Sequence, residues 1–325
     1  MPERSLRIGT RGSALALRQT ERVRARLAEQ GCCTDRVEIR TTGDVLPDAP
    51  LARIGDRALF TKQLDDAMLE GRIDAAIHSL KDLPTRLPDG IALAAVGLRE
   101  DPRDALVARD GLGWATLPRG ARVATSSLRR RAQLLLARPD LEIVDIRGNV
   151  DTRLAKLERN RDWSAIVLAC AGLVRLGLEA RISERLPLEL MLPAPGQGAL
   201  AATVRSDDDA AADALRRALH EPEVELAVTA ERAFLRRLEG GCQVPIAAHA
   251  TVRDEYGRRV VRLGARIASL GGERCVEGAR TTAELTVGGA AALGEQLADE
   301  LVACGAAAIL DSVRAASRAA PVPEP

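Results

Sequence analysis

The sequence predicts an α/β protein of three domains. Its 325 residues exceed one compact core of ordinary size, since a domain commonly takes about 100–200 residues. Over the first two thirds, short β-type runs alternate with amphipathic helical segments, a rhythm that is typical of βαβ units around a parallel sheet. After residue 245, three strand-like runs follow one another directly, which indicates a small antiparallel sheet in an α+β domain.

The first third of the chain contains three strand-like runs, "LRIGT", "RVEIRTT" and "IDAAIHS". Helices are expected over 13–30 and 61–70, because apolar residues recur there at helical spacing. The pattern starts again near residue 103 with "ARVATSS", "LEIVDIRG" and "AIVLACAG", separated by expected helices over 128–137 and 152–159. This restart predicts a second lobe that is built like the first.

The last third begins at the glycine- and proline-rich stretch "LPAPGQGALAATVR", which predicts a hinge followed by a strand. Helices are expected over 207–219 and from Pro222 to 239–240, where a glycine ends the helix. The runs "AAHATVRD", "RRVVRLGARIAS" and "RCVEGART" predict the antiparallel sheet, and an expected helix over 290–304 closes it. Residues 319–325, "AAPVPEP", are expected to form a flexible tail.

The charge balance disfavours several classes of partner. Forty-seven basic residues against 46 acidic ones leave a net charge of +1, so no global field attracts nucleic acid or an anionic membrane. Aromatic residues make up 2% of the chain, too few for a base-stacking platform. The longest apolar run, 165–174, is about half a membrane span, and the N-terminus lacks an apolar core of signal-peptide length. We therefore expect a soluble cytoplasmic protein with no nucleic-acid or membrane partner.

The six cysteines and three histidines show no metal-binding spacing, so no metal site is expected. One cysteine stands apart, because Cys242 in "LEGGCQVP" follows two glycines and should project from an exposed loop. The default for a cysteine in a reducing compartment is a free thiol. Since no His-Asp pair accompanies Cys242, a covalent attachment point is a better functional hypothesis than a hydrolase nucleophile.

Arginines that follow a strand end predict a local anion site. "VATSSLRRRAQLL" places three hydroxyl residues and then three arginines at the start of a helix: Thr125, Ser126, Ser127, Arg129, Arg130 and Arg131. Hydroxyl groups cap free backbone N–H groups, and the same N–H groups bind anions. Positive charge in a first turn opposes the helix macrodipole, so a negative group should lie nearby. The alternative is a solvated arginine face.

A second strand end repeats this arrangement in "DIRGNVDTRL", with Arg147, Gly148, Asn149 and Arg153 in order. The glycine lets the backbone turn, the asparagine can cap, and the last arginine lies in the first turn of the next helix. Strand ends of this kind are where α/β sheets bind ligands, and guanidinium groups match carboxylates or phosphates. Two further arginines follow strands in a similar way, Arg11 and Arg175.

The segment "AIHSLKDLP" ends a strand with Lys81 and Asp82 before a proline. Asp82 is either a turn residue or a carboxylate that moves protons and stabilises a cation in an arginine-lined cleft. The residue alone does not decide between these alternatives. His78 is expected to be a hydrogen-bonded strand-end residue rather than a base.

Ten segments, in order over nearly the whole chain, resemble the porphobilinogen deaminase (hydroxymethylbilane synthase) family. They are "RIGTRGSALAL", "TTGD", "ALFTKQLDDAML", "DAAIHSLKDLP", "REDPRDAL", "ATSSLRRRAQL", "IRGNVDTRL", "LACAGLVRLGL", "LPAPGQGAL" and "RLEGGCQVPIAAHA". The resemblance implies two lobes like type II periplasmic binding proteins, with a cleft between them, and a third domain that bears the cofactor. Residues 1–100 with 193–217 are then expected to form the first lobe, 103–192 the second, and 221–318 the third domain.

The resemblance also implies the chemistry. Cys242 would carry a dipyrromethane cofactor through a thioether, and this cofactor would act as the primer. Four porphobilinogen molecules would be added with loss of ammonia, and hydrolysis would release the linear tetrapyrrole hydroxymethylbilane, an intermediate of haem biosynthesis. A monomer is expected, with the product passed to uroporphyrinogen-III synthase.

The same resemblance assigns roles to residues. Loss of ammonia creates an azafulvene cation, which a carboxylate beside the pyrrole N–H can stabilise, and the HSLKDLP motif gives that role to Asp82. Each porphobilinogen brings two carboxylates, so several cationic groups are needed. The expected cofactor- or substrate-binding residues are Arg11, Ser13, Phe60, Lys81, Thr125, Ser126, Ser127, Arg129, Arg130, Arg147, Gly148, Asn149, Arg153, Arg175 and Gln197. The chain departs from the family pattern at Arg53 and Arg57, where lysine is frequent, and at Gln63, where glutamate is usual.

Two other classes of function remain open at this point. A non-catalytic bilobal anion-binding protein, or the sensor half of a regulator, would explain the arginine sites and the hinge. It would not explain Cys242 on a glycine loop. A cysteine-dependent hydrolase would need a base beside Cys242, and the sequence offers no obvious one.

Overall fold

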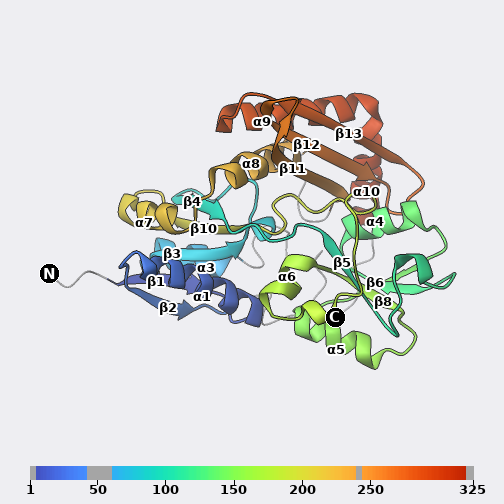
Figure 1. Ribbon diagram of the computed structural model, residues 1–325, viewed down its shortest axis with the longest axis horizontal. Coiled ribbons are helices and arrows are strands. Elements are labelled where there is room, and N and C mark those ends of the chain that lie inside the picture. Colours follow the sequence, from blue (N-terminus) through green and yellow to red (C-terminus); the bar gives the residue numbers. More distant parts are fainter. Residues whose placement is uncertain (1–4, 42–60, 239–243, 320–325) are drawn as a thin grey trace.

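The computed structural model describes residues 5–41, 61–238 and 244–319. Within these ranges the strands form two five-stranded sheets and one three-stranded sheet, each with its own helices. Figure 1 shows the first sheet at the left, the second at the right and the third above both. The predicted mixed α/β class, with a separate small antiparallel sheet, is confirmed.

The first sheet has the strand order β2-β1-β3-β10-β4. Its strands are β1 (Leu6–Thr10), β2 (Thr34–Glu38), β3 (Ala75–Ser79), β4 (Ile91–Gly97) and β10 (Leu200–Arg205). β1 is parallel to β2 and β3, whereas β10 is antiparallel to both of its neighbours. Apolar side chains of α1 (Ala14–Glu29) and α7 (Asp209–Leu219) pack on one face, and those of α3 (Lys62–Leu69) pack on the other.

The second sheet repeats this plan in the order β7-β6-β8-β5-β9. Its strands are β5 (Asp104–Ala108), β6 (Arg122–Ala124), β7 (Glu142–Val144), β8 (Ala165–Ala169) and β9 (Glu184–Arg185). β6 is parallel to β7 and β8, and β5 is the antiparallel strand in fourth position. Helix α4 (Leu128–Ala137) covers one face, while α5 (Val150–Arg159) and α6 (Cys170–Arg175) cover the other.

The chain crosses between the two lobes twice, through residues 98–103 and 192–199. Each crossover delivers the antiparallel strand of the lobe that it enters, β5 in the second lobe and β10 in the first. The crossovers touch, because the Glu100 N–H donates to the Gly198 carbonyl at 3.0 Å. Gly198 has φ 90°, and a Cβ there would lie 2.4 Å from the Glu100 carbonyl oxygen, so only glycine fits this approach.

The third sheet is an antiparallel meander of β11 (Ile246–Glu255), β12 (Arg258–Ala268) and β13 (Cys275–Thr282). Tyr256 and Gly257 both have positive φ, as a two-residue hairpin turn requires. Helices α8 (Pro222–Arg237), α9 (Val287–Leu301) and α10 (Ala307–Ala319) pack on one face of the sheet around the fully buried Phe234.

Local signals explain most helix starts. Ser13 caps α1 by accepting from the Ala16 N–H, so the helix begins one residue later than expected. Ser127 caps α4 in the same way, and Pro222 is the first residue of α8. The expected helix over 290–304 is wrong in extent, because the helical path continues through 302–306 into α10. Gly305, with φ 100°, resembles a helix end, but the chain resumes a helix after it.

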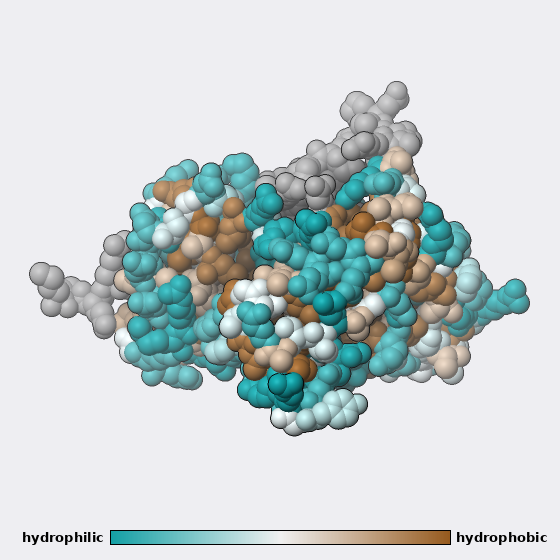
Figure 2. Space-filling model, turned by 90° about the horizontal axis from the view of Figure 1, so that it is seen from above, coloured by the Kyte–Doolittle hydropathy of each residue, from teal (hydrophilic) through white to brown (hydrophobic). Residues whose placement is uncertain are grey.

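The surface is mixed in polarity. Seen from above, hydrophilic residues surround separate groups of hydrophobic ones (Figure 2). In the described part of the chain, none of the helices combines the length and apolar character that crossing a bilayer requires.

Gly294 should be the tightest point between α8 and α9. A Cβ at Gly294 would lie 2.2 Å from the Ala230 carbonyl oxygen and 2.8 Å from the Phe234 nitrogen. We expect Gly294→Ala to lower the free energy of unfolding by about 1–3 kcal/mol, as overpacking does. Gly288→Ala, in the same helix but with open space around it, should raise that free energy by up to about 1 kcal/mol. Urea unfolding of both variants measures the difference, and equal effects would contradict the packing argument.

Candidate active site

A cleft of about 250 Å³ lies between the two lobes and takes side chains from both. The first lobe contributes Arg11, Ser13, Gln19, His78, Ser79, Lys81 and Asp82, and the second contributes Arg130, Gly148, Asn149, Arg153 and Arg175. Gly198 and Ala199 of the second crossover, Asp151 of the second lobe and several apolar residues also line it. The cleft is therefore at the place where strand ends of both sheets meet.

The first lobe presents Asp82 and Lys81 on a short 3-10 turn directly after β3. Asp82 is exposed to the cleft, whereas Lys81 is half-buried. Burial, reinforced by the charge of Arg130 and opposed by that of Asp82, lowers the pKa of Lys81 to about 8. The ammonium group remains mainly protonated at neutral pH and is an available partner for an anion.

His78 and Gln19 also line the cleft on the side of the first lobe. The His78 Nε2 lies 3.0 Å from the Thr203 Oγ1, and burial lowers the pKa of the imidazole to about 4. His78 is thus neutral and hydrogen-bonded, as the sequence predicts. The Gln19 Nε2 donates to the Ser79 Oγ at 2.8 Å, and this contact orients Gln19. Gln19 is not among the site residues that the sequence predicts.

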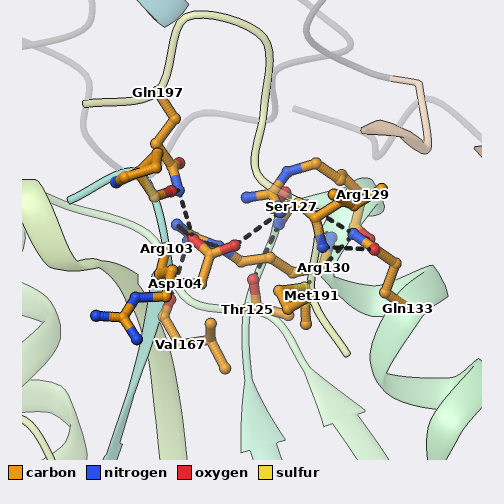
Figure 3. Close-up of polar contacts among 12 residues, drawn as sticks. Arg103, Asp104, Thr125, Ser127, Arg129, Arg130, Gln133, Val167, Met191 and Gln197 are labelled. Carbon is orange, nitrogen blue, oxygen red and sulfur yellow. Dashed lines mark hydrogen bonds and ion pairs between the residues drawn. The ribbon is translucent and has the colours of Figure 1, made fainter. Parts of the chain in front are cut away.

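The second lobe holds its arginines on one buried carboxylate (Figure 3). The Asp104 Oδ2 accepts from the Arg129 Nη1 at 2.7 Å, and the Asp104 Oδ1 accepts from the Arg130 Nη2 at 2.7 Å. Asp104 is fully buried, and both arginines are almost so. Although burial favours the neutral acid, the two guanidinium groups hold the pKa of Asp104 far below its usual range. Asp104 is the negative group that the first-turn arginines require.

The alternative of a solvated arginine face is therefore wrong for Arg129 and Arg130, and only Arg131 of this run is exposed. Sequence reasoning also missed Asp104 itself. The signal was present, since a charged residue opens the apolar strand "DALVA", and a buried carboxylate needs a partner.

The cleft carries more positive than negative charge. Among the side chains that line it, Arg11, Lys81, Arg130, Arg153 and Arg175 are cationic, whereas Asp82 and Asp151 are acidic, which leaves an excess of three positive charges. Burial, with the charges of Arg130 and Arg147, lowers the pKa of Arg153 to about 10. The buried Nε of Arg175 has no hydrogen-bond partner in the described part of the chain. Buried charge of this kind needs a counter-ion, so the cleft fits a ligand with carboxylates.

The hydroxyl residues before α4 are used by the backbone. The Ser127 Oγ accepts from the Arg130 N–H at 3.4 Å, and the Thr125 Oγ1 accepts from the Ser127 N–H at 3.2 Å. The Ser126 Oγ donates to the Ile146 carbonyl and accepts from the Ile146 N–H, which joins two strand ends. In the second loop, the Arg153 Nε donates to the Gly148 carbonyl at 2.7 Å.

The structure brings nine of the predicted site residues to the cleft: Arg11, Ser13, Lys81, Asp82, Arg130, Gly148, Asn149, Arg153 and Arg175. Six lie beside it without lining it: Thr125, Ser126, Ser127, Arg129, Arg147 and Gln197. Phe60 and Cys242, with the departures at Arg53 and Arg57, lie outside the described residues. No group of three or more metal-ligating side chains occurs within 5–41, 61–238 and 244–319.

Comparison with known proteins gives consistent matches along the chain. A family model described as "Porphobilinogen deaminase, dipyromethane cofactor binding domain" matches residues 6–213, and "Porphobilinogen deaminase, C-terminal domain" matches residues 225–303. The porphobilinogen deaminase of Rubrobacter xylanophilus is 51% identical over 94% of this chain and 97% of its own length. That of Syntrophotalea carbinolica is 48% identical over 95% of this chain and 96% of its own. A solved structure of the methionine binding protein MetQ aligns over 66% of this chain and 87% of its own, with 12% identity and a TM-score of 0.40.

Asp104→Asn should destabilise the protein by about 3–5 kcal/mol, because it leaves two buried guanidinium groups without a carboxylate. Asp162→Asn, which breaks an exposed pair with Arg122, should cost about 0–1 kcal/mol. The depressed pKa of Asp104 contributes stability above its ordinary value near 4, and this contribution is lost as the pH falls further.

The gap in unfolding free energy between the wild type and Asp104→Asn should thus be constant above about pH 5 and narrow below about pH 4. Urea unfolding at several pH values measures this gap. A gap that stays constant to pH 3, or one as small as that of Asp162→Asn, would contradict the role of Asp104.

Proposed function

The chain belongs to the porphobilinogen deaminase family, and from that membership we propose how its cleft carries out the family reaction. The reaction assembles four porphobilinogen molecules, with release of ammonia, into the linear tetrapyrrole hydroxymethylbilane on a dipyrromethane cofactor. The observation that carries the proposal is an exposed carboxylate, Asp82, directly after β3 in a cleft that is lined by more cationic than acidic side chains. This supports the synthase over a bilobal binding protein or a cysteine hydrolase.

The cationic side chains fit the cofactor and the substrate, both of which bear acetate and propionate groups. Arg130, Arg153 and Arg175 line the cleft from the second lobe, and Arg11 and Lys81 do so from the first. We assign these residues to carboxylate binding, with Arg129 and Arg147 as supporting charges. When bound, the dipyrromethane supplies the pyrrole to which porphobilinogen units are added. Cys242 is its proposed point of attachment, through a thioether.

Asp82 is the proposed catalytic residue. When ammonia leaves the aminomethyl group of porphobilinogen, positive charge develops on the pyrrole, and a fixed carboxylate beside the N–H stabilises it. The same carboxylate is proposed to take up the proton that is lost when the new carbon–carbon bond replaces a carbon–hydrogen bond of the accepting ring. Lys81 is adjacent in sequence and directs its own charge to a carboxylate of the ligand.

The remaining residues are proposed to position the ligand. Ser13, Gly148 and Asn149 line the cleft, and Thr125, Ser126, Ser127 and Gln197 support the loops that carry the arginines. Phe60 is proposed to cover the cofactor.

The domain division and biological context are part of the proposal. The pairing of β10 within the first sheet and the packing of α7 on it support a first lobe of residues 1–100 and 193–217, with 103–192 as the second lobe and 221–318 as the cofactor-bearing domain. We propose a cytoplasmic monomer that takes porphobilinogen as substrate and passes its product to uroporphyrinogen-III synthase.

Cys242→Ser should give a folded protein that never gains the mass of two porphobilinogen units less two ammonia molecules. The balance follows from the reaction, since each unit replaces a carbon–nitrogen bond and releases one ammonia, the first by bonding to the thiol sulfur. Cys304→Ser, at an exposed free cysteine, is the matched control and should gain the full mass. Intact mass with peptide mapping reads this out, and the same mass on the Cys242→Ser protein would exclude the attachment site.

Asp82→Asn should load and bind porphobilinogen but lose about 10²–10⁴ in turnover, the usual contribution of a general acid–base group. Asp89→Asn, an exposed change in the same loop, should keep wild-type turnover. Steady-state rates of hydroxymethylbilane release measure both variants. Wild-type kcat in Asp82→Asn would refute the catalytic assignment.

A further inference from the structure

The turn of the second crossover, residues 194–199, is held by polar contacts from three parts of the molecule. The Gly198 carbonyl accepts from Arg175 of the second lobe at 2.5 Å, and the Gln197 carbonyl accepts from the Arg99 Nε at 3.2 Å. The Gly196 N–H donates to Glu231 at 2.6 Å. Three side chains from different parts of the molecule therefore hold the backbone of this turn.

Glu231 belongs to α8 of the third domain and is fully buried. Its Oε2 accepts from the Gly196 N–H, and its Oε1 accepts from the Ala250 N–H in β11 at 2.7 Å. Both oxygens lie close to the Arg99 Nη2, at 2.8 and 3.1 Å. One carboxylate thus joins the third domain to both crossovers, with its charge balanced by a single guanidinium group.

The side chain of Gln197 continues this network into the cleft wall. It is 1% exposed, and its Nε2 donates to the Asp104 Oδ1 at 3.0 Å, a contact that Figure 3 shows. A second contact runs from the Nε2 to the Pro102 carbonyl at 2.7 Å. At the other end, the Gln197 Oε1 accepts from the Lys81 Nζ at 3.2 Å. The amide presents its donor end to a carboxylate of the second lobe and its acceptor end to an ammonium group of the first.

We propose that Glu231 is a positioning residue for the cleft: it fixes the turn at Gly196 so that the Gln197 amide bridges Lys81 and Asp104. The proposal rests on the proposed function, in which Lys81 and the Asp104-bound Arg130 bind ligand carboxylates. It gives the third domain a part in shaping the charge of the cleft, although Glu231 does not line it.

The bridge acts on two charges at once. A carbonyl oxygen that accepts from an ammonium group stabilises its charged form, so loss of this contact lowers the lysine pKa. A donor to Asp104 helps hold the carboxylate that carries both arginines. If the turn shifts, the amide loses one or both partners, and the cationic groups lose their relative positions.

The chain offers a direct probe of Lys81, since its lysines are only Lys62, Lys81 and Lys156. Reductive methylation with ¹³C-formaldehyde keeps the positive charge and gives each lysine its own NMR resonance, which Lys→Arg variants assign. The charged groups around Lys81 are Asp82, Asp104, Arg129 and Arg130. None of them is changed in the experiment, so a shifted titration midpoint reports on the bridge.

Four full-length proteins are compared with the wild type: Glu231→Gln, Gln197→Leu, the double variant and the control Glu223→Gln. Glu223 lies on the same helix, exposed and paired with Arg259. We expect Glu231→Gln and Gln197→Leu each to lower the Lys81 midpoint by about 0.5 unit or more. The double variant should fall no lower than Gln197→Leu, while Lys62, Lys156 and the control stay at wild-type values.

A merely structural Glu231 gives a different pattern. The urea midpoint would drop in Glu231→Gln, but the Lys81 midpoint would stay at its wild-type value, or the two substitutions would add independently. Either outcome overturns the proposal. If Glu231→Gln does not fold, Glu231→Asp takes its place, because it keeps the charge but shortens the reach to Gly196. A lowered Lys81 midpoint in Glu231→Asp would then support the positioning role, and an unchanged midpoint would overturn it.

A second readout separates this inference from the proposed function. Apoprotein is incubated with porphobilinogen or with preformed hydroxymethylbilane, and the gain of cofactor mass is followed by intact mass. Glu231→Gln should acquire it severalfold more slowly than Glu223→Gln, and equal rates would overturn the proposal. If even the wild type gains no mass, the proposed function fails, whereas the lysine titration still tests the positioning role.

Discussion

The ion pairs of Asp104 with Arg129 and Arg130 are the interaction on which the cleft depends. A lone buried guanidinium group is costly, and two adjacent ones would be more so. One fully buried carboxylate lets both exist at the start of α4, against the direction of the helix macrodipole. Because Asp104 already neutralises part of the charge of Arg129 and Arg130, the other cationic side chains of the cleft can remain without a carboxylate of their own.

The position of Asp104 follows from the crossovers. It is the first residue of β5, the strand that enters the second lobe from residues 98–103. Gln197, in the other crossover, donates to the same carboxylate. The two crossovers therefore come together at the Asp104 carboxylate, and the close contact between Glu100 and Gly198 keeps them together. A two-lobed binding site needs a connection of this kind, since its halves are otherwise separate sheets.

Much of the fold and many of the cleft residues could be predicted from the sequence, but the long-range partners of those residues could not. Strand-end motifs such as TSSLRR and HSLKDLP identify the cleft residues, because turn chemistry and capping are local. A local signal can mark a buried charge such as Asp104, but it does not say which distant residue is its partner: Asp104 lies 25 residues from Arg129, and Gln197 lies 116 residues from Lys81. Helix α10 was not predicted for a related reason, since Gly305 has the conformation of a helix end and packing against the third sheet accompanies the helix that follows. The sequence thus predicts which residues line the cleft better than it predicts which contacts hold them in place.

The excess of positive charge has a consequence for stability. Buried cations whose charge no carboxylate balances lower the stability of the protein alone, and an anionic ligand that neutralises them binds the folded state only. Lys81, Arg153 and Arg175 all have lowered pKa values caused chiefly by burial. Burial of each charge therefore destabilises the folded protein when no ligand is bound. A covalently held anionic cofactor would remove the cost permanently, because its effective concentration does not fall on dilution. The charges proposed to bind carboxylates would therefore favour a primer that stays attached over one that exchanges with solution.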